Sequence, residues 1–364
     1  MLVAKKIGII TIMDYGNYGN RLQNYALTYY LQKNYDLKVE TLTLIPEYKR
    51  RNIFIDFKQN LIVFLCRFYK FSKKKFDIDT VRWANFSRWN KKIPIRKIYG
   101  KKQIPQSINN EYDYFIVGSD QVWNYTFSYN SFYDYFLCFA TNDKKIALSA
   151  SFGVDVIPMK WKSFMRKELL TFNKISVRET SGKKIIKDLI GADIDVLIDP
   201  TMLLNAKEWY KLAKKPKLNF NLPYILTCFI GKSERMFDIE NWAREKGYQI
   251  FNLFDKSCYN LYITGPREYL YLIANAKLVC TDSFHSVVFS IIFSVPFIVF
   301  NRKGTQCDMS SRLHTLLNTF DFDNRWEFKV QKEDYLKCDF TRVDDILSKK
   351  QKQVQDFFRK CFHY

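Results

Sequence analysis

The stretch KKIGIITIMDYGNYGNRLQNYALTYYLQK, residues 5–33, points to the fold class of this chain. Its first part, Lys5–Ile12, is a short apolar run that predicts a buried strand. Met13–Asn20 is a loop rich in glycine and asparagine. In Arg21–Lys33 the apolar side chains recur at helical spacing, which predicts a helix. A strand, a tight loop and a helix form the opening unit of an α/β fold.

The same alternation continues along the 364 residues. Further strands are predicted at Leu37–Leu44, Tyr112–Val117, Lys145–Ser149, Lys174–Arg178, Asp195–Ile198, Tyr224–Phe229, Tyr248–Asn252, Lys277–Cys280 and Phe297–Phe300. Helices are predicted between several of them, and strands that alternate with helices imply mostly parallel sheets. The length favours two domains. We therefore predict two Rossmann-like α/β lobes with a central cleft.

The Lys-rich stretch Thr201–Asn221 is the predicted linker between the lobes. The first lobe is expected to comprise residues 1–212, with a basic, aromatic insertion at 46–105. The second lobe is expected at residues 213–335. Residues 336–364 contain a polar helix, Val343–Phe362, which we expect to pack back on the first lobe.

The net charge of +21 is concentrated in the segment Pro46–Pro105, which has 17 Lys and Arg against four Asp and Glu. Its apolar residues include Phe54, Phe57, Leu61, Ile62, Phe64, Leu65, Phe68, Tyr69 and Phe71. One interpretation is an amphipathic helical insertion whose lysines are solvated. Another is a patch that binds anionic membrane surfaces. Nucleic-acid or polyanion binding is a third, but no nucleic-acid-binding motif accompanies the charge.

Targeting and metal-binding signals are not evident. The longest apolar stretch, Val287–Phe300, includes serines and Pro296 and falls short of the roughly 20 residues that a membrane span needs. The eight cysteines have no metal-ligand or redox spacing. We expect a cytoplasmic protein, at or near the inner face of the membrane if the basic segment binds lipid, with no metal and no bound cofactor.

Five short polar stretches each lie at the end of a predicted strand, and open α/β sheets bind ligands at that edge. In the first, Asp14–Asn24, two glycines permit a tight loop before a helix N-terminus, where free N–H groups attract anions. Asn17 and Asn20 are its candidate ligand-binding residues. The alternative is a plain turn in which the asparagines cap the helix.

The second and third stretches are Val117–Asn124 and Ser149–Gly153. Asp120 is suited to accept a hydrogen bond or a proton from a sugar hydroxyl, and the Trp123 ring could stack on a sugar face. The alternative makes Asp120 a helix cap and Trp123 a core residue. The small residues of the third stretch permit close approach of a ligand.

The fourth and fifth stretches are Ser176–Glu179 and Thr281–Ser286. The planar guanidinium of Arg178 can grip a carboxylate or phosphate with two hydrogen bonds, unless it is a surface ion pair with Glu179. His285 falls in the first turn of a predicted helix, beside hydroxyls and free N–H groups. This position suits a general acid or base that acts on an anionic substrate. A locally hydrogen-bonded histidine is the alternative.

In order along the chain, the five stretches resemble the polysaccharide pyruvyl transferase family. The matching pieces are Gly16–Asn20, Leu22–Leu27, Gly118–Asn124, Ser149–Gly153, Ser176–Glu179, Asp199–Thr201, Thr281–His285 and Pro296. The resemblance implies a two-lobed fold like that of the B-type glycosyltransferases. It also implies transfer of the pyruvyl group of phosphoenolpyruvate to a sugar, usually as a cyclic ketal, in bacterial surface polysaccharide biosynthesis.

The roles implied by this resemblance fall on the residues already singled out. His285 is the expected acid, Arg178 the anion ligand, and Asp120 the base or the acceptor anchor. Expected donor-binding residues, mainly in the second lobe, are Arg178, Thr281, Ser283, His285, Ser286 and Arg312. Expected acceptor-binding residues, in the first lobe, are Asn17, Asn20, Ser119, Asp120, Gln121, Trp123, Ser149 and Ser151. The acceptor is a sugar or a lipid-linked oligosaccharide.

One departure from the family pattern concerns the donor. Many members carry Arg-Leu-His where this chain has Ser283, Phe284 and His285. Arg312 or Arg302 is a candidate to replace the missing arginine. The departure also keeps an alternative open, a glycosyltransferase of the same two-lobed fold that uses a nucleotide sugar.

Overall fold

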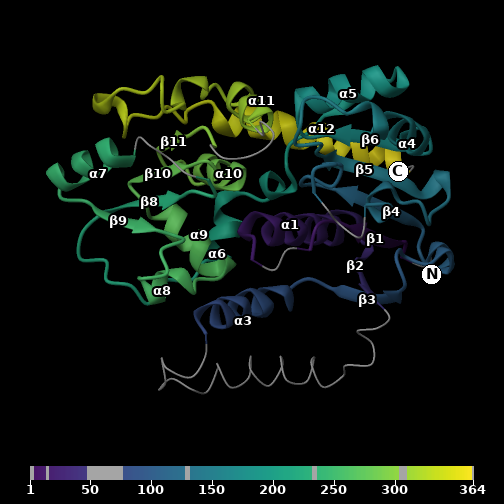
Figure 1. The fold of residues 1–364 in the computed structure, drawn as a ribbon, viewed down its shortest axis with the longest axis horizontal. Helices are drawn as coiled ribbons and strands as arrows, with labels where there is room; N and C mark the ends of the chain where they lie inside the picture. The colour runs from purple at the N-terminus through teal and green to yellow at the C-terminus, as the bar shows by residue number, and fades with distance from the viewer. Residues whose placement is uncertain are drawn as a thin grey trace.

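The computed structural model describes residues 4–13, 16–46, 77–127, 132–231, 236–302 and 310–362. Within these residues the strands form two sheets, one of seven strands and one of four (Figure 1). All strand pairings in both sheets are parallel. The predicted fold, two α/β lobes with mostly parallel sheets, is confirmed.

The first sheet has the strand order β3-β2-β1-β4-β5-β6-β7. Its strands are β1 (Lys6–Ile10), β2 (Lys38–Pro46), β3 (Ile95–Gly100), β4 (Tyr114–Gly118), β5 (Lys145–Ala150), β6 (Lys174–Val177) and β7 (Asp195–Val196). Its longer helices are α1 (Tyr18–Tyr35), α3 (Ile78–Asn90), α4 (Met159–Leu169) and α5 (Thr180–Ile190). The strand order changes direction between β1 and β4, which creates the crevice where such sheets bind ligands.

The second sheet has the order β11-β10-β8-β9. Its strands are β8 (Tyr224–Cys228), β9 (Gln249–Asn252), β10 (Leu278–Thr281) and β11 (Phe297–Val299). Its helices are α7 (Met236–Glu245), α8 (Tyr259–Tyr262), α9 (Pro266–Ala274), α10 (Phe284–Ile292) and α11 (Ser311–Thr319). Every residue of α10 is buried, because this helix packs on α9, α11 and also α1 of the first lobe. One hydrophobic cluster therefore runs through both lobes.

The predicted linker is more ordered than expected. It contains a short 3₁₀ helix, η5 (Pro200–Leu203), and the helix α6 (Ala206–Leu212), which begins with a capping box between Asn205 and Glu208. Trp209 of α6 is buried and donates a hydrogen bond from Nε1 to the carbonyl of Thr201 at 2.8 Å. The segment that connects the two lobes is therefore ordered and packs into the core.

The predicted insertion at 46–105 is partly wrong. Residues 47–76, with all of its aromatic residues listed above, lie outside the described residues. The remainder belongs to the fold itself, because β3 pairs with β2 and α3 contacts both α8 and α9 of the second lobe. Because lysine and arginine are so frequent in this segment, the helix α3 and the edge strand β3 were not predicted from the sequence.

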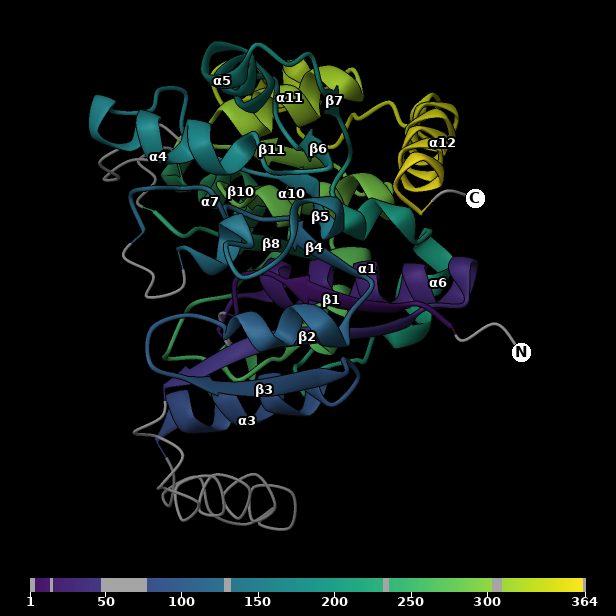
Figure 2. The ribbon, with the colours of Figure 1, turned by 90° about the vertical axis from the view of Figure 1, so that its right-hand side faces the viewer.

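The C-terminal helix α12 (Val343–Phe362) returns from the second lobe to the first (Figures 1 and 2). Its Phe358 ring lies 6.2 Å from that of Tyr30 and 5.6 Å from that of Tyr35, both in α1. Lys5 donates a hydrogen bond from Nζ to the carbonyl of Phe362. Among the described helices, none combines the length and the apolar character that crossing a membrane requires.

Candidate active site between the two sheets

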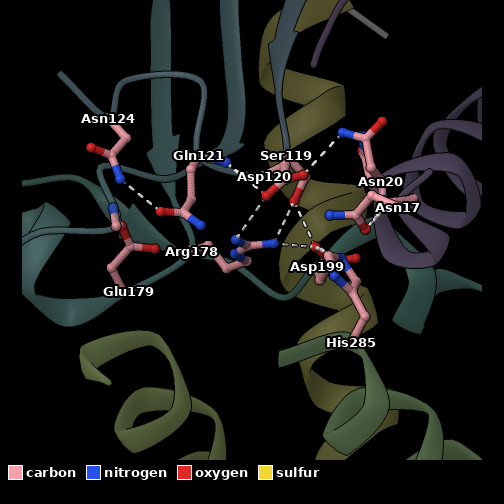
Figure 3. Close-up of polar contacts among 12 residues, drawn as sticks. Asn17, Asn20, Ser119, Asp120, Gln121, Asn124, Arg178, Glu179, Asp199 and His285 are labelled. Atoms are coloured by element: carbon pink, nitrogen blue, oxygen red, sulfur yellow. Dashed lines mark hydrogen bonds and ion pairs between the residues drawn. The ribbon is translucent and has the colours of Figure 1, made fainter. Parts of the chain in front are cut away.

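The candidate site lies where segments after the carboxyl ends of strands from both sheets meet (Figure 3). Ser119 and Asp120 follow β4, Arg178 follows β6 and Asp199 follows β7. From the second lobe, His285 lies in the first turn of α10, directly after β10. The structure therefore brings together the three residues predicted to be catalytic, His285, Arg178 and Asp120.

Arg178 is buried in an ion pair with Asp199. Its Nη1 lies 2.7 Å from Asp199 Oδ2 and 3.3 Å from the Ser119 hydroxyl oxygen, and Ser119 donates to the same carboxylate oxygen. Arg178 Nη2 lies 3.8 Å from Asp120 Oδ1. Arg178 is not a surface partner of Glu179, because the Glu179 carboxylate accepts hydrogen bonds from the backbone N–H groups of Phe152 and Gly153.

Asp199 connects the two lobes. Its Oδ1 accepts hydrogen bonds from the N–H and hydroxyl of Thr201, and its Oδ2 lies 3.6 Å from His285 Nε2. Burial alone would raise the pKa of Asp199, but His285, Arg178 and Ser119 hold that pKa well below its usual range. Asp199 was not among the predicted site residues, although its place after a strand, in Asp199–Thr201, was the available signal.

Asp120 is directed into the site by a sharp turn after β4. Gly118 has φ +140°, and a Cβ there would lie 2.0 Å from the Leu148 carbonyl oxygen. Asp120 itself has φ 63°. Its carboxylate accepts hydrogen bonds from Asn20 Nδ2 at 3.0 Å and from the N–H of Gln121 at 2.9 Å. Burial by itself would raise the pKa of Asp120. The combined opposite effects of Arg178 and then His285 bring this pKa below its usual value, so the carboxylate is ionised at neutral pH.

The imidazole of His285 packs against the start of α1. A Cβ on Gly19 would lie only 1.9 Å from His285 Nδ1, so the side chain of any other residue would displace the ring. His285 is 7% exposed, and its Nε2 has no hydrogen-bond partner among the described residues. Gly19 and Asp199 together fix the ring across the boundary between the lobes.

A second arginine enters the site from α11. Arg312 is buried, and its two Nη atoms lie 3.1 and 3.2 Å from the side-chain oxygen of Gln121 when that amide oxygen is turned toward them. Burial, with a smaller contribution from Arg178, lowers the pKa of Arg312 to about 10. Arg302 instead pairs with Asp282 at 3.3 Å. Of the two candidates for the missing family arginine, Arg312 is therefore the one beside Arg178.

Trp123 does not face the site, and its predicted role as a sugar-stacking surface is wrong. The side chain is fully buried, with its ring 5.7 Å from that of Phe136 and 5.1 Å from that of Phe152. Its Nε1 donates to the carbonyl of Tyr135. The alternative interpretation, a core residue, describes it correctly.

Several predicted polar ligands support the framework of the site. Asn17 caps α1 by accepting from the N–H of Asn20, and Ser149 donates to the carbonyl of Ile198. Thr281 donates to the carbonyl of Cys228 and accepts from the N–H of Ser283, and Ser286 pairs with the Tyr269 hydroxyl. Ser151 is fully buried, and Ser283 is the N-cap residue of α10. No metal-binding group of three or more His, Cys, Asp or Glu occurs in the described residues.

Solved structures with distant similarity to this chain include a UDP-GlcNAc 2-epimerase and a wall teichoic acid polymerase. UDP-GlcNAc 2-epimerase from Neisseria meningitidis, bound to UDP-GlcNAc, has a TM-score of 0.46 and 9% identity, covering 98% of this chain and 100% of that chain. The H444N variant of the wall teichoic acid polymerase TagF has a TM-score of 0.43 and 12% identity, covering 98% of this chain and 84% of that chain. No curated protein matches the sequence.

The sequence profile of the polysaccharide pyruvyl transferase family matches residues 17–304, which is most of the chain. The matched range includes Asp120, Arg178, Asp199 and His285, and ends before Arg312. This chain belongs to the polysaccharide pyruvyl transferase family.

Proposed function

We propose that this protein transfers the pyruvyl group of phosphoenolpyruvate to sugar hydroxyls as a cyclic ketal, in the biosynthesis of a bacterial surface polysaccharide. The observation that carries the proposal is the convergence of Arg178, Arg312 and His285 from both lobes. Each has a buried side-chain nitrogen without a hydrogen-bond partner among the described residues. Such a group costs about 1–3 kcal/mol, which a ligand rich in anionic oxygens would offset.

Phosphoenolpyruvate has a carboxylate and a phosphate, and both suit guanidinium groups. Arg178 Nε and Nη2 and Arg312 Nε have no hydrogen-bond partner among the described residues, and Nη2 lies 3.8 Å from Asp120 Oδ1. In the proposed complex the two arginines hold the two anionic ends of the donor. The Arg178–Asp199 contact keeps the first guanidinium in place while its remaining N–H groups bind the ligand.

The first chemical step is protonation of the methylene carbon of the donor, which creates an oxocarbenium-like centre at the neighbouring carbon. His285 supplies this proton, a role that typically contributes ~10²–10⁴ in rate. Asp199 Oδ2, at 3.6 Å from Nε2, holds the imidazole in the site from the other lobe. The absence of a side chain at Gly19 leaves the space that the ring occupies.

A sugar hydroxyl then attacks the cationic carbon. Asp120 orients this hydroxyl and accepts the hydroxyl proton. The lowered pKa of Asp120 keeps the carboxylate ionised, so that it can accept the hydrogen bond. A second hydroxyl of the same sugar displaces phosphate from that carbon and closes the ketal. In the overall balance, one hydroxyl proton ends on the new methyl group and the other on the released phosphate.

The direct test is incubation with phosphoenolpyruvate and a panel of nitrophenyl glycosides and lipid-linked sugars. We expect equal amounts of released phosphate and of a sugar with the mass of a pyruvyl ketal, and neither with the His285→Ala variant. Thermal shift assays with phosphoenolpyruvate and with UDP- and GDP-sugars provide the contrast. Stabilisation by a nucleotide sugar alone would contradict the proposal and favour a glycosyltransferase.

Peripheral contact with the membrane is a separate part of the proposal, and it concerns a segment whose residues 47–76 lie outside the described residues. Basic residues near an anionic bilayer contribute about 1 kcal/mol each. We expect the protein to co-sediment with anionic vesicles at low salt and not with neutral vesicles. If anionic vesicles fail to bind the folded protein at low salt, a soluble acceptor becomes the simpler proposal.

A further inference from the structure

Phe284, the first residue of α10, contacts all three of the groups proposed to act on the donor. Its ring centroid lies 4.2 Å from Cζ of Arg178 and 5.8 Å from Cζ of Arg312. The imidazole of His285 stands almost perpendicular to the same ring, at 5.3 Å between centroids. Phe284 is itself buried. One aromatic ring thus lies at the centre of a cluster drawn from both lobes.

The two arginines lie near each other, and Arg178 contributes to the lowered pKa of Arg312. A buried arginine is usually held by a carboxylate, which also compensates its charge. An aromatic face attracts a guanidinium through the ring quadrupole, and it leaves the positive charge and the N–H edge available. Asp199 already pairs with Arg178 at 2.7 Å, and Phe284 adds a contact to both cations that does not compete with an anionic ligand for them.

The ring also forms part of the wall of a small cavity of about 30 Å³, with Arg178, Met202, Leu316 and Phe320 among the other lining residues. A smaller side chain at position 284 would enlarge this space and would destabilise the protein whatever the ring does for the arginines. A decisive test must therefore change the electrostatics of the ring and leave its shape almost unchanged.

We propose that Phe284 is a positioning residue for the donor, and that cation–π attraction to Arg178 and Arg312 sets the affinity of the site for its anionic ligand. The inference rests on the anion-binding part of the function proposed above. It does not depend on the identity of the acceptor or on ketal formation.

The experiment replaces Phe284 with mono-, di- and trifluorinated phenylalanine, which weaken the negative face of the ring stepwise. Binding of phosphoenolpyruvate is measured by calorimetry, and KM and kcat are measured in the phosphate-release assay. We expect Kd and KM for phosphoenolpyruvate to rise with each fluorine, by roughly 3- to 30-fold across the series, with little change in kcat. A flat series would overturn the proposal.

Phe289 provides the matched control, because it is buried in the same helix but packs on Trp209 and Tyr269. Fluorination there should leave the affinity unchanged. Phe284→Leu should weaken binding at least as much as the trifluorinated ring. If the leucine variant weakens binding while the fluorinated series stays flat, the ring acts by packing alone and the proposal is wrong.

The same series separates this inference from the proposed function. If the wild type does not bind phosphoenolpyruvate, inorganic phosphate and UDP are used as probes. A graded loss of affinity for either probe would support the role of Phe284 and contradict the proposed donor. If the folded wild type binds none of the three anions, both proposals fail.

Discussion

Two pairs of buried arginines in this protein have opposite surroundings. Arg325 donates to four backbone carbonyls, and Arg82, which links α3 to the second lobe, donates to the Tyr18 hydroxyl and the Tyr262 carbonyl. Arg178 and Arg312 are buried as deeply, yet both retain nitrogens without partners among the described residues.

This difference distinguishes arginines that are buried to support the fold from arginines that are buried to bind a ligand. A buried cation that only supports the fold needs its donors satisfied, because each unmet donor costs about 1–3 kcal/mol. Nε, Nη1 and Nη2 of Arg325 and Nη1 of Arg82 donate to fixed backbone and side-chain oxygens. The side chains of Arg178 and Arg312 both contact Phe284, which also packs on His285, and a ligand there would complete the bonding of their nitrogens. The predictions below test this separation.

The largest effect is expected from His285→Ala. Loss of the proposed acid should lower turnover by ~10²–10⁴ while the protein stays folded. Turnover is measured by phosphate release, and folding by circular dichroism and thermal melting. His314→Ala, at an exposed position of α11, is the control and should retain activity. Near-normal turnover of the His285 variant would remove this residue from the mechanism.

Arg178→Lys and Arg325→Lys should have opposite signatures. Lysine keeps the charge but loses the paired N–H geometry, so Arg178→Lys should raise KM for phosphoenolpyruvate roughly 10- to 100-fold. Arg325→Lys should leave KM unchanged and lower the free energy of unfolding by about 2–4 kcal/mol, because one ammonium cannot reach all four carbonyls. An unchanged KM for Arg178→Lys would place Arg178 with the structural arginines.

Asp134 extends the comparison to a buried carboxyl that forms no ion pair within the described residues. Burial raises its pKa from 3.8 to about 6, although its Oδ1 accepts a hydrogen bond from the N–H of Ile104. The stability that the neutral acid contributes is complete below pH ~4 and is lost as the pH rises through about 6. Asp134→Asn keeps the Oδ1 acceptor and cannot ionise.

We therefore expect Asp134→Asn to become more stable relative to the wild type as the pH rises, by up to about 3 kcal/mol between pH 4 and pH 7. Urea unfolding at several pH values measures this difference. A constant difference across the range would show that Asp134 ionises normally in the folded protein.

The smallest effect is expected from Tyr18→Phe in the well-bonded contact between the lobes. The Tyr18 hydroxyl interacts with the carbonyl and the hydroxyl of Thr264 and accepts from Arg82. Its removal should cost about 1–2 kcal/mol of folding free energy and leave kcat per folded molecule unchanged. A change in KM for phosphoenolpyruvate would mean that this contact is coupled to the site.

Some features were determined by the sequence alone. The α/β class follows from apolar periodicity and from glycine- and asparagine-rich loops, which are local properties. The division into two lobes follows from the chain length and the Lys-rich linker. Arg178, Asp120 and His285 were found because each follows a predicted strand, and parallel strands bring their carboxyl ends to one edge. The departure at Ser283 and Phe284 was also visible in the sequence.

Other features were decided only by the tertiary structure. The sequence allowed Trp123 either a ligand surface or the core, and left Arg312 and Arg302 as equal candidates. It also gave no reason to place Asp199 against His285 or Phe284 beside two arginines. These outcomes depend on burial and on partners far away along the chain, 191 residues apart for Gln121 and Arg312. Neither quantity is a local property, because both arise only when the two sheets pack together.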